Sequence, residues 1–377
     1  MNYRNEINEI VESRKLSYTS ISDSIWGFAE SRFQEFQSSE IQQEYLRSQG
    51  FSIESNLSGE ETAFIAECGS GKPIIAFVGE FDALSSLQQE ADITERCPIP
   101  GKQNGHGCGH HLLGTGSLAA ADSLKTFIEK NQLSGTVRYY GCPAEENAGG
   151  KAFLVRDGYF NDCDVALSWH PHSTNKVTGA DCFLSNFRAF FTFHGISSHA
   201  AGAPELGRSA LDAVEMMDIG VNFMREHMIS SARIHGAITN TGGIAPNVIP
   251  SEAQVLYAIR APKLTQVKQL FDRMCDIAKG AALITGTTVS IKQVAAYSNV
   301  IHNETLGEIM DEHLRAFVPI GYTNEELLYA EKFKNVITKL DQEGLYSTVS
   351  QIVTKDKRQE TLAMPILDLV IDRRSMI

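Results

Sequence analysis

The sequence predicts an α/β protein with an inserted α+β domain, and three observations support this prediction. Strand-like apolar runs alternate with helical patterns up to about residue 171, as in a sheet whose faces are covered by helices. From about residue 184 the order becomes β-α-β-β-α-β, which is typical of a small ferredoxin-like domain. Helical patterns resume after about residue 298, as expected if the chain returns to the first domain. The predicted boundaries are 1–183, 184–297 and 298–377, with the first and last segments forming one domain.

The first segment starts with helical patterns that extend to Gly50. Two strands are predicted at 61–68 and 73–81, and the second is nearly all apolar, as in a strand buried on both faces. The elements predicted next are a helix at 112–130, a strand at 135–146, a helix at 148–160 and a strand at 163–171. Polar residues suited to chemistry follow these strands directly, where open α/β sheets bind their ligands.

The inserted segment begins with FRAFFTFHG (187–195), whose alternation predicts a half-exposed strand. The amphipathic pattern of residues 205–228 predicts a helix. The remaining predicted elements are strands at 233–243 and 251–262, a helix at 264–284 and a strand at 287–298.

Composition narrows the function classes. Of the 377 residues, 42% are hydrophobic and 21% are charged, as in ordinary soluble proteins. The net charge of −13 argues against nucleic acid or an anionic membrane as a partner. The chain has neither a long apolar run nor a signal-like start, so we expect a cytoplasmic protein. The seven cysteines lack a disulfide-framework spacing, and only Cys108 has unusual neighbours.

Residues 105–114, GHGCGHHLLG, concentrate one cysteine and three histidines among glycines. Cys108 and His110 are two residues apart, so in an extended backbone their side chains project to the same side. Thiolate and imidazole are good ligands for Zn²⁺ and similar ions, and glycines let the backbone turn tightly beside an ion. A single cysteine or histidine would more often be structural, but this concentration favours a metal site.

Two further clusters follow predicted strands. Adjacent carboxylates such as Glu145 and Glu146 are usually solvated on a surface. At a strand end, however, they point in different directions, so one can bind metal while the other accepts a proton from water. The segment SWHPH supplies His170 and His172 after the next strand. Three such clusters at strand ends favour metal-assisted hydrolysis over three unrelated surface features.

A competing motif begins at Gly114, because GTGSLA fits the G-x-G-x-x-G/A dinucleotide-binding pattern. The motif lies inside a predicted helix instead of directly after a strand, which is the wrong context. Packing of small residues against the sheet explains it better, so we do not predict a dinucleotide site.

In order, the segments GEFDAL, GHGCGHHLLG, GCPAEE, SWHP, SSHAAGAPELGRSALDA and NTGGIAPNVIP resemble the aminoacylase/carboxypeptidase family of dinuclear amidohydrolases, in clan MH. The resemblance covers nearly the whole chain and is strongest to the aminobenzoyl-glutamate hydrolases, in particular to their B-type subunits. It implies a zinc-peptidase-like catalytic domain with an inserted lid domain that forms dimers. It also implies two divalent metal ions, Zn²⁺ or Mn²⁺, and cleavage of an amide bond in N-acyl or aryl amino acids such as p-aminobenzoyl-glutamate or related folate fragments.

The resemblance assigns roles in the predicted catalytic domain. Cys108, His110, Glu146 and His170 match metal ligands, and Glu145 matches the general base. Asp82 matches an Asp-Ala-Leu segment near the metals, where it would orient a ligand. A turn residue at a strand end is the alternative interpretation of Asp82.

In the predicted lid, His199 resembles a histidine that reaches a partner subunit's active site and stabilises the developing oxyanion. Asn247 and Arg260 resemble groups that hold the substrate carboxylate, a task that suits the planar guanidinium. A surface ion pair on a lid strand is the alternative for Arg260. The resemblance implies a homodimer through the lid or a heteromer with a related subunit.

The sequence departs from the family at two places. His111 stands where many relatives carry Asp. In relatives, a Gly-His segment near the end of the chain supplies a further metal ligand, and this segment has no match before Ile377. The one histidine after residue 302 is His313, which lacks the residues that flank the ligand histidine in relatives. The expectation is a truncated or frame-shifted chain with weaker metal binding. The alternatives are a dipeptidase or aminoacylase of the same family, or a catalytically impaired subunit that supplies His199 to a partner.

Overall fold

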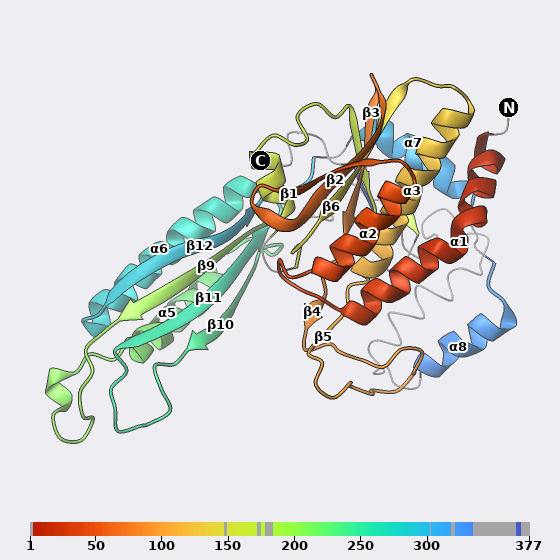
Figure 1. Cartoon of the computed structure of the whole chain (residues 1–377). Helices are drawn as coiled ribbons and strands as arrows, with labels where there is room; N and C mark the ends of the chain where they lie inside the picture. The colour runs from red at the N-terminus through yellow and green to blue at the C-terminus, as the bar shows by residue number, and fades with distance from the viewer. Residues whose placement is uncertain are drawn as a thin grey trace. The chain divides into compact units, whose positions relative to one another are not determined.

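The computed structural model describes residues 3–146, 149–171, 175–177, 184–301, 303–317, 321–334 and 367–370 (Figure 1). The chain divides into two compact units. Unit 1 comprises the described residues before 180 and after 300, and unit 2 comprises those between 180 and 300. His172, Cys182 and the terminal RRSMI lie outside the described residues.

Three helices pack on one face of the unit 1 sheet, namely α1 (Tyr3–Phe28), α2 (Phe36–Ser48) and α3 (His110–Lys130) (Figure 1). Each contributes an apolar stripe, because its hydrophobic residues recur at helical spacing. Ile25 of α1, Leu46 of α2 and Leu118 of α3 are fully buried in one cluster with strand residues such as Phe64 and Tyr139. This layer fixes the start of α3 against the sheet.

The unit 1 sheet has the strand order β1-β2-β6-β3-β7-β13-β8. The strands are β1 (Ser52–Leu57), β2 (Glu60–Ser70), β3 (Ile74–Glu80), β6 (Gly135–Cys142), β7 (Val165–Ser168), β8 (Lys176–Val177) and β13 (Leu367–Val370). Strand β3 pairs in parallel with β6 on one side and with β7 on the other. The carboxyl ends of these three neighbours therefore meet at one edge, where the residues after each strand come together.

The remaining elements of unit 1 are short or peripheral. They are β4 (Leu84–Ser85), β5 (Asn104–Gly105), α4 (Lys151–Arg156), α7 (Glu304–Arg315) and α8 (Asn324–Lys334). None of the helices in the described part of the chain is long and apolar enough to cross a membrane.

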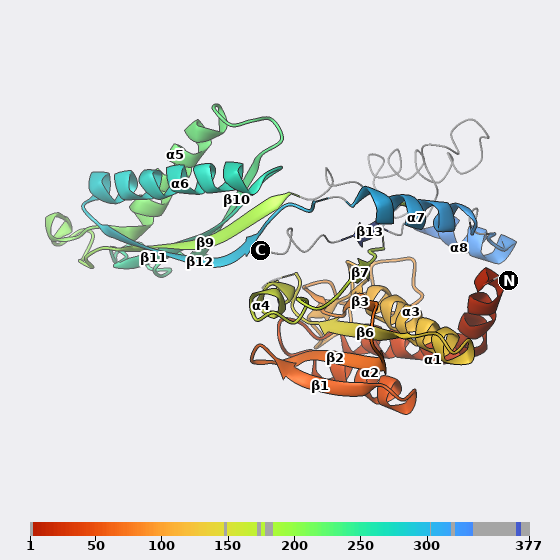
Figure 2. The same ribbon diagram turned by 90° about the horizontal axis from the view of Figure 1, so that it is seen from above.

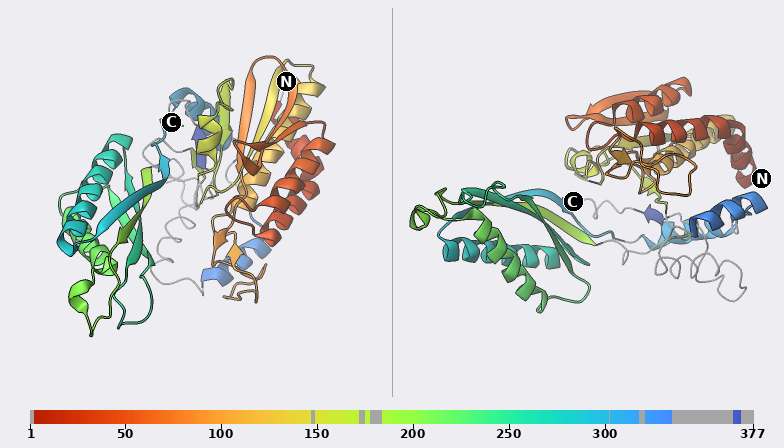
Figure 3. Two further views of the ribbon diagram at one scale, coloured as in Figure 1. Left: turned by 60° about the vertical axis from the view of Figure 1, so that its left-hand side comes forward. Right: turned by 90° about the horizontal axis from the view of Figure 1, so that it is seen from below.

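Unit 2 is a four-stranded antiparallel sheet with the order β10-β11-β9-β12. Its strands are β9 (Ser185–His194), β10 (Arg233–Asn240), β11 (Glu252–Ala261) and β12 (Thr288–Tyr297). The helices α5 (Ala210–Arg225) and α6 (Leu264–Thr285) lie on the same side of this sheet (Figures 2 and 3). Chain order and strand order together are those of a ferredoxin-like domain, as predicted.

The structure corrects several predicted elements. Strand β1 was not predicted, although it forms an antiparallel hairpin with β2. The strand predicted at 135–146 ends at Cys142, and the helix predicted at 148–160 is confined to Lys151–Arg156. Residues 145–146 and 157–160 are in turns instead, and Ala144 before the first of them is in the left-handed region at φ 55°. Periodicity extended the elements too far because it does not detect such a turn.

Candidate metal centre and active site

Residues from four segments converge at the carboxyl edge of the parallel strands. Glu80 ends β3 and Asp82 follows it, Glu145 and Glu146 follow β6, and His170 follows β7. Cys108 and His110 arrive from the loop that begins α3. The structure therefore brings together all the metal and base residues predicted in unit 1, through the parallel pairing of β6, β3 and β7.

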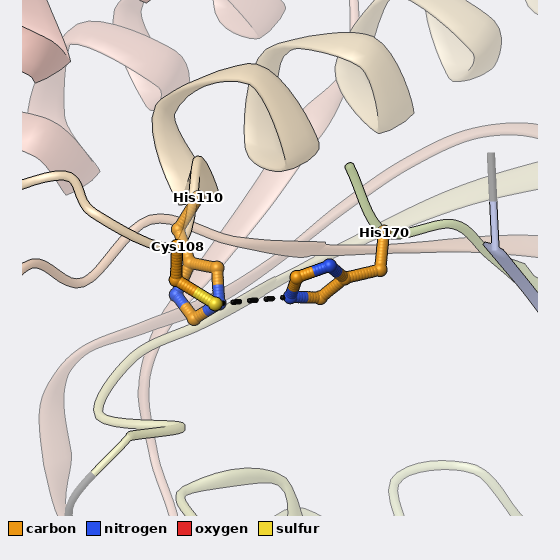
Figure 4. A group of neighbouring side chains, drawn as sticks. All are labelled: Cys108, His110 and His170. Atoms are coloured by element: carbon orange, nitrogen blue, oxygen red, sulfur yellow. Dashed lines mark hydrogen bonds between the residues drawn. The ribbon is translucent and has the colours of Figure 1, made fainter. Parts of the chain in front are cut away.

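Cys108 and His170 face each other across the site. The Sγ of Cys108 lies 3.2 Å from Nε2 of His170, and His110 stands beside them (Figure 4). Gly109 makes this approach possible, because its φ of 79° is left-handed and a Cβ built there would lie 3.0 Å from Pro171. The loop thus turns between Cys108 and His110 and keeps both side chains at one place.

His110 is the most buried of these residues, with no exposed surface. Its Nδ1 lies 2.8 Å from Oδ1 of Asp82, and its Nε2 lies 3.1 Å from Oε2 of Glu80 and 3.9 Å from Oε1 of Glu146. Burial disfavours the imidazolium, but hydrogen bonds to Asp82 and Cys108 and the charge of Glu80 outweigh burial and raise the pKa of His110 to about 11. Three carboxylates therefore surround one imidazole.

Asp82 connects two of the site residues. One carboxylate oxygen bonds Nδ1 of His110, and the other accepts the backbone N–H of Glu146 at 3.0 Å. A carboxylate on the far nitrogen of an imidazole fixes its orientation and leaves the other nitrogen for a metal ion. This geometry supports the orienting role predicted for Asp82.

Glu145 lies within reach of the same cluster. One of its oxygens is within 4.8 Å of ligand atoms of Glu80 and His110. Burial, followed by the charge of Glu80, raises the pKa of Glu145 to about 7. A carboxylate with a pKa near 7 can accept a proton from water and return it to a leaving group at neutral pH.

The donor set fits divalent metal ions. Two groups of three candidate ligands have their atoms within 4.8 Å of one another, namely Cys108, His110 and His170, and Glu80, His110 and Glu145. The buried Nε2 of His110 makes no well-formed hydrogen bond among the described residues, and its neighbours are carboxylate oxygens of Glu80 at 3.1 Å and Glu146 at 3.9 Å. Once deprotonated, this nitrogen is available to an ion together with those oxygens. Thiolate, imidazole and carboxylate together suit Zn²⁺ and also Mn²⁺.

Glu80 was missed by the sequence analysis. It is 5% exposed, lies beside His110, and forms an ion pair with Lys151 that lowers the pKa of Glu80 despite its burial. The signal was its spacing, since residues two apart at a strand end, such as Glu80 and Asp82, project to the same side. The ion pair between Glu80 and Lys151 also neutralises part of the negative charge around His110.

The other two histidines of the loop, His106 and His111, lie outside the candidate ligand groups. Nε2 of His106 lies 3.0 Å from the carbonyl oxygen of Ile25, and the rings of His106 and His111 are 5.0 Å apart. Burial lowers the pKa of His106 to about 4 and that of His111 to about 3. Both are therefore neutral at pH 7, and neither belongs to the two candidate ligand groups found among the described residues.

The glycines of the rejected dinucleotide motif pack against the sheet, as predicted. A Cβ at Gly114 would lie 2.6 Å from the carbonyl oxygen of Glu80, and one at Gly116 would lie 2.6 Å from the ring of Trp169. Both glycines allow α3 to approach the strands that carry the site.

In unit 2, His199 and Asn247 lie side by side. The backbone of His199 bridges that of Val248, and the N–H of Ala200 donates to the carbonyl oxygen of Asn247 at 3.0 Å. The Nδ1 of His199 accepts the N–H of Gly202 at 3.0 Å, which leaves Nε2 directed away from this turn. Both side chains are exposed.

Arg260 lies at the opposite end of the unit 2 sheet. It pairs with Asn186 near the start of β9, whereas His199 follows the end of β9. Strands of this length separate their ends by about 30 Å. Within one chain, therefore, the structure does not bring Arg260 together with His199 and Asn247.

A metal ion that binds this site must displace protons. At pH 7 His110 is protonated, and burial raises the pKa of the Cys108 thiol above its usual value. Binding is therefore expected to release about two protons, and affinity to rise by about tenfold per pH unit for each proton displaced. Calorimetric titration with Zn²⁺ in buffers of different ionisation enthalpy measures this release. The matched variant Cys108→Ser should release about one proton fewer; affinity independent of pH between 6 and 8 would contradict the expectation.

The fold and the ligand cluster define the class of protein, namely a metal-dependent hydrolase built on an α/β unit with a ferredoxin-like second unit. The model of the peptidase dimerisation domain matches residues 186–285, which lie within unit 2. Two solved structures have a similar fold. The first is an aminobenzoyl-glutamate utilization protein from Klebsiella pneumoniae, with a TM-score of 0.68 at 20% identity, and the match covers 83% of this chain and 84% of that one. The second is a dinuclear metal-binding peptidase of the M20 family from Bacillus subtilis, with a TM-score of 0.56 at 21% identity, and the match covers 80% of this chain and 81% of that one.

Two curated relatives are more similar in sequence. The chain is 44% identical over 344 residues to the B-type subunit of p-aminobenzoyl-glutamate hydrolase from Escherichia coli (strain K12), covering 91% of this chain and 71% of that protein. It is 35% identical over 258 residues to Xaa-Arg dipeptidase of Mus musculus, covering 66% of this chain and 55% of that protein. The chain belongs to the M20 family of metallopeptidases and amidohydrolases, which hydrolyse amide bonds. It spans about half to seven tenths of the length of these two relatives.

Proposed function

We propose that this chain hydrolyses the amide bond of p-aminobenzoyl-glutamate or of related folate fragments. The observation that carries this proposal is the position of the partly buried carboxyl of Glu145, with a pKa raised to about 7, within 4.8 Å of ligand atoms of Glu80 and His110. The 44% identity to one of the two subunit types of p-aminobenzoyl-glutamate hydrolase supports the choice of substrate.

The residues of unit 1 would bind the metal ions and transfer the proton during hydrolysis. Cys108, His110, Glu146 and His170 would hold two divalent ions, Zn²⁺ or Mn²⁺, with Asp82 orienting His110. When bound, such ions polarise the scissile carbonyl and lower the pKa of water. Glu145 would take the proton of the attacking water and deliver it to the leaving amine. The domain division 1–183, 184–297 and 298–377 is part of this proposal.

The residues of unit 2 would bind the substrate and stabilise its transition state. The exposed His199 would donate a hydrogen bond to the developing oxyanion, and Asn247 beside it and the guanidinium of Arg260 would hold the substrate carboxylate. Because the sheet separates Arg260 from His199 by about 30 Å, we infer that His199 and Asn247 serve the site of a partner subunit. One substrate carboxylate would then be held by Asn247 of one chain and Arg260 of the other.

A panel of three substrates tests this specificity. We expect p-aminobenzoyl-glutamate to give a higher kcat/KM than an Xaa-Arg dipeptide, with an N-acetyl amino acid as the third substrate. The dipeptide is the leading alternative because of the 35% identity to an Xaa-Arg dipeptidase. Equal or faster cleavage of the dipeptide would replace the proposed substrate by a peptide of that type.

The proposed dimer forms through unit 2, with a second copy on the edge made by β10 and α5. Strand β10 is the outer strand beside β11, and seven of its eight residues are exposed. An open edge of this kind presents unpaired backbone groups to another strand. Beside it, α5 exposes Ile219 and Phe223, four residues apart on one face of the helix. The match of residues 186–285 to a dimerisation domain supports this assignment.

Phe223→Arg is expected to produce a monomer, because the side chain is 65% exposed and a charge there would have to be buried in the interface. Light scattering coupled to size-exclusion chromatography measures the mass. The matched control is Leu283→Arg on α6, where an apolar side chain is 85% exposed away from this edge. A Phe223→Arg dimer, or a Leu283→Arg monomer, would contradict the proposed interface.

A further inference from the structure

The backbone immediately before the proposed base has an unusual conformation. Ala144 is fully buried and has a φ of 55°, a left-handed conformation that residues with a Cβ rarely adopt. Its C=O accepts the N–H of Gly149 at 2.8 Å, and its N–H donates to Oε1 of Glu35 at 3.2 Å. Both polar groups of Ala144 are thus held, and the direction in which Glu145 and Glu146 leave β6 depends on these bonds.

Glu35 is arranged as an acceptor of hydrogen bonds. Its side chain is fully buried at the residue that precedes α2. Besides Ala144, it accepts the N–H of Phe33 at 3.0 Å and the hydroxyl of Thr62 at 3.2 Å. All three donors belong to separate segments of unit 1, so one carboxyl group joins the α1–α2 connection, β2 and the loop after β6.

The same connection also holds the loop after β3. The carbonyl oxygen of Glu30 accepts the N–H of Ala83 at 2.7 Å, one residue beyond Asp82. Asp82 in turn accepts the N–H of Glu146. The connection between α1 and α2 therefore lies against both strand ends that carry site carboxylates, and Glu35 provides its side-chain contact to the loop of the base.

We infer that Glu35 is a positioning residue for hydrolysis, which holds Ala144 in its left-handed conformation and thereby aims Glu145 and Glu146 at their positions. The inference rests on the proposed roles of Glu145 as base and Glu146 as ligand. Glu35 does not touch the metal cluster, and its effect passes through the backbone of Ala144. Glu35 acts as a buried acceptor for the N–H of Ala144 at 3.2 Å. This role does not require a negative charge on Glu35.

Three variants of Glu35 separate these requirements. Glu35→Gln keeps a carbonyl oxygen that can accept from Phe33 and Ala144, and its amide can donate to the Thr62 hydroxyl. Glu35→Met has a similar volume but no comparable acceptor. Glu35→Asp keeps the charge but is one methylene too short to reach Ala144. Glu60→Gln is the matched control, because Glu60 is another buried carboxyl of unit 1 whose oxygens have no hydrogen-bond partner among the described residues.

Two readouts are measured on the full chain, kcat and KM for p-aminobenzoyl-glutamate and the visible absorption spectrum of the Co²⁺-loaded protein. We expect Glu35→Met and Glu35→Asp to lower kcat by about 10–100-fold, with KM changed by less than about threefold, because a misplaced catalytic group costs rate more than binding. Their Co²⁺ spectra should shift, because Glu146 moves with the loop. Glu35→Gln and Glu60→Gln should resemble the unmodified chain in both readouts.

The inference is overturned if Glu35→Asp keeps the unmodified kcat and spectrum, or if Glu35→Gln is as impaired as Glu35→Asp. These comparisons hold even when Glu35→Met does not fold. If the unmodified chain does not cleave p-aminobenzoyl-glutamate, the proposed substrate fails while the Co²⁺ spectra still decide the role of Glu35. An unshifted spectrum in Glu35→Asp would then overturn it.

Discussion

Glu145→Gln is expected to lower kcat for amide hydrolysis by about 10²–10⁴-fold, because the amide cannot accept a proton from water. The substitution keeps the shape of a partly buried side chain whose pKa is raised to about 7. Metal affinity should remain within a few-fold, since Glu145 is the proposed base. Steady-state kinetics and calorimetric metal titration of the same preparation measure both properties.

The matched control is Glu146→Gln, at the adjacent residue. This variant should lose metal affinity as well as activity, because Glu146 is the proposed ligand. A Glu145→Gln protein that turns over at the unmodified rate, or a pair of variants with their metal affinities reversed, would show that the two roles are wrongly assigned.

His199→Ala is expected to lower kcat by about 10²–10³-fold through loss of an oxyanion donor. Because His199 is proposed to act in the partner's site, this variant and Glu145→Gln should complement each other when they are coexpressed. A mixed dimer contains one site with both groups intact, and half of the dimers are mixed, so about a quarter of the unmodified activity should return.

The control for complementation is coexpression of Glu145→Gln with Cys108→Ala. Both residues come from unit 1, so no mixed dimer can assemble a complete site from these two chains. Recovery in this control, or no recovery with His199→Ala once mixed dimers are demonstrated, would place His199 in the site of its own chain.

The sequence predicted most of the site because its residues follow strands. Glu145 and His170 are separated by 25 positions in the chain, but each comes after a strand that pairs in parallel with β3. The alternation of strands and helices in the sequence predicts a parallel sheet, and therefore predicts that these residues lie at one edge of it. The ferredoxin-like order of unit 2 was equally accessible, since strand and helix periodicities alternate clearly there.

Other features depend on contacts that periodicity does not contain. Glu35 lies more than 100 residues before Ala144 in the chain, and only the packing of α2 on the sheet brings them together. Glu80 was missed because its importance comes from Lys151 and His110, which reach it from two other segments. The separation of Arg260 from His199 became visible only when the register of β9 and β11 was known.

The central claim is tested most directly by incubating the purified chain with p-aminobenzoyl-glutamate and measuring the release of p-aminobenzoate and glutamate. The chain is first stripped with a chelator and then assayed with and without added Zn²⁺ or Mn²⁺. We predict release of both products in equal amounts after addition of metal and none in its absence. Release that persists in the stripped chain, or no release with either metal while the dipeptide is cleaved, would contradict the proposed metal-dependent hydrolysis of this substrate.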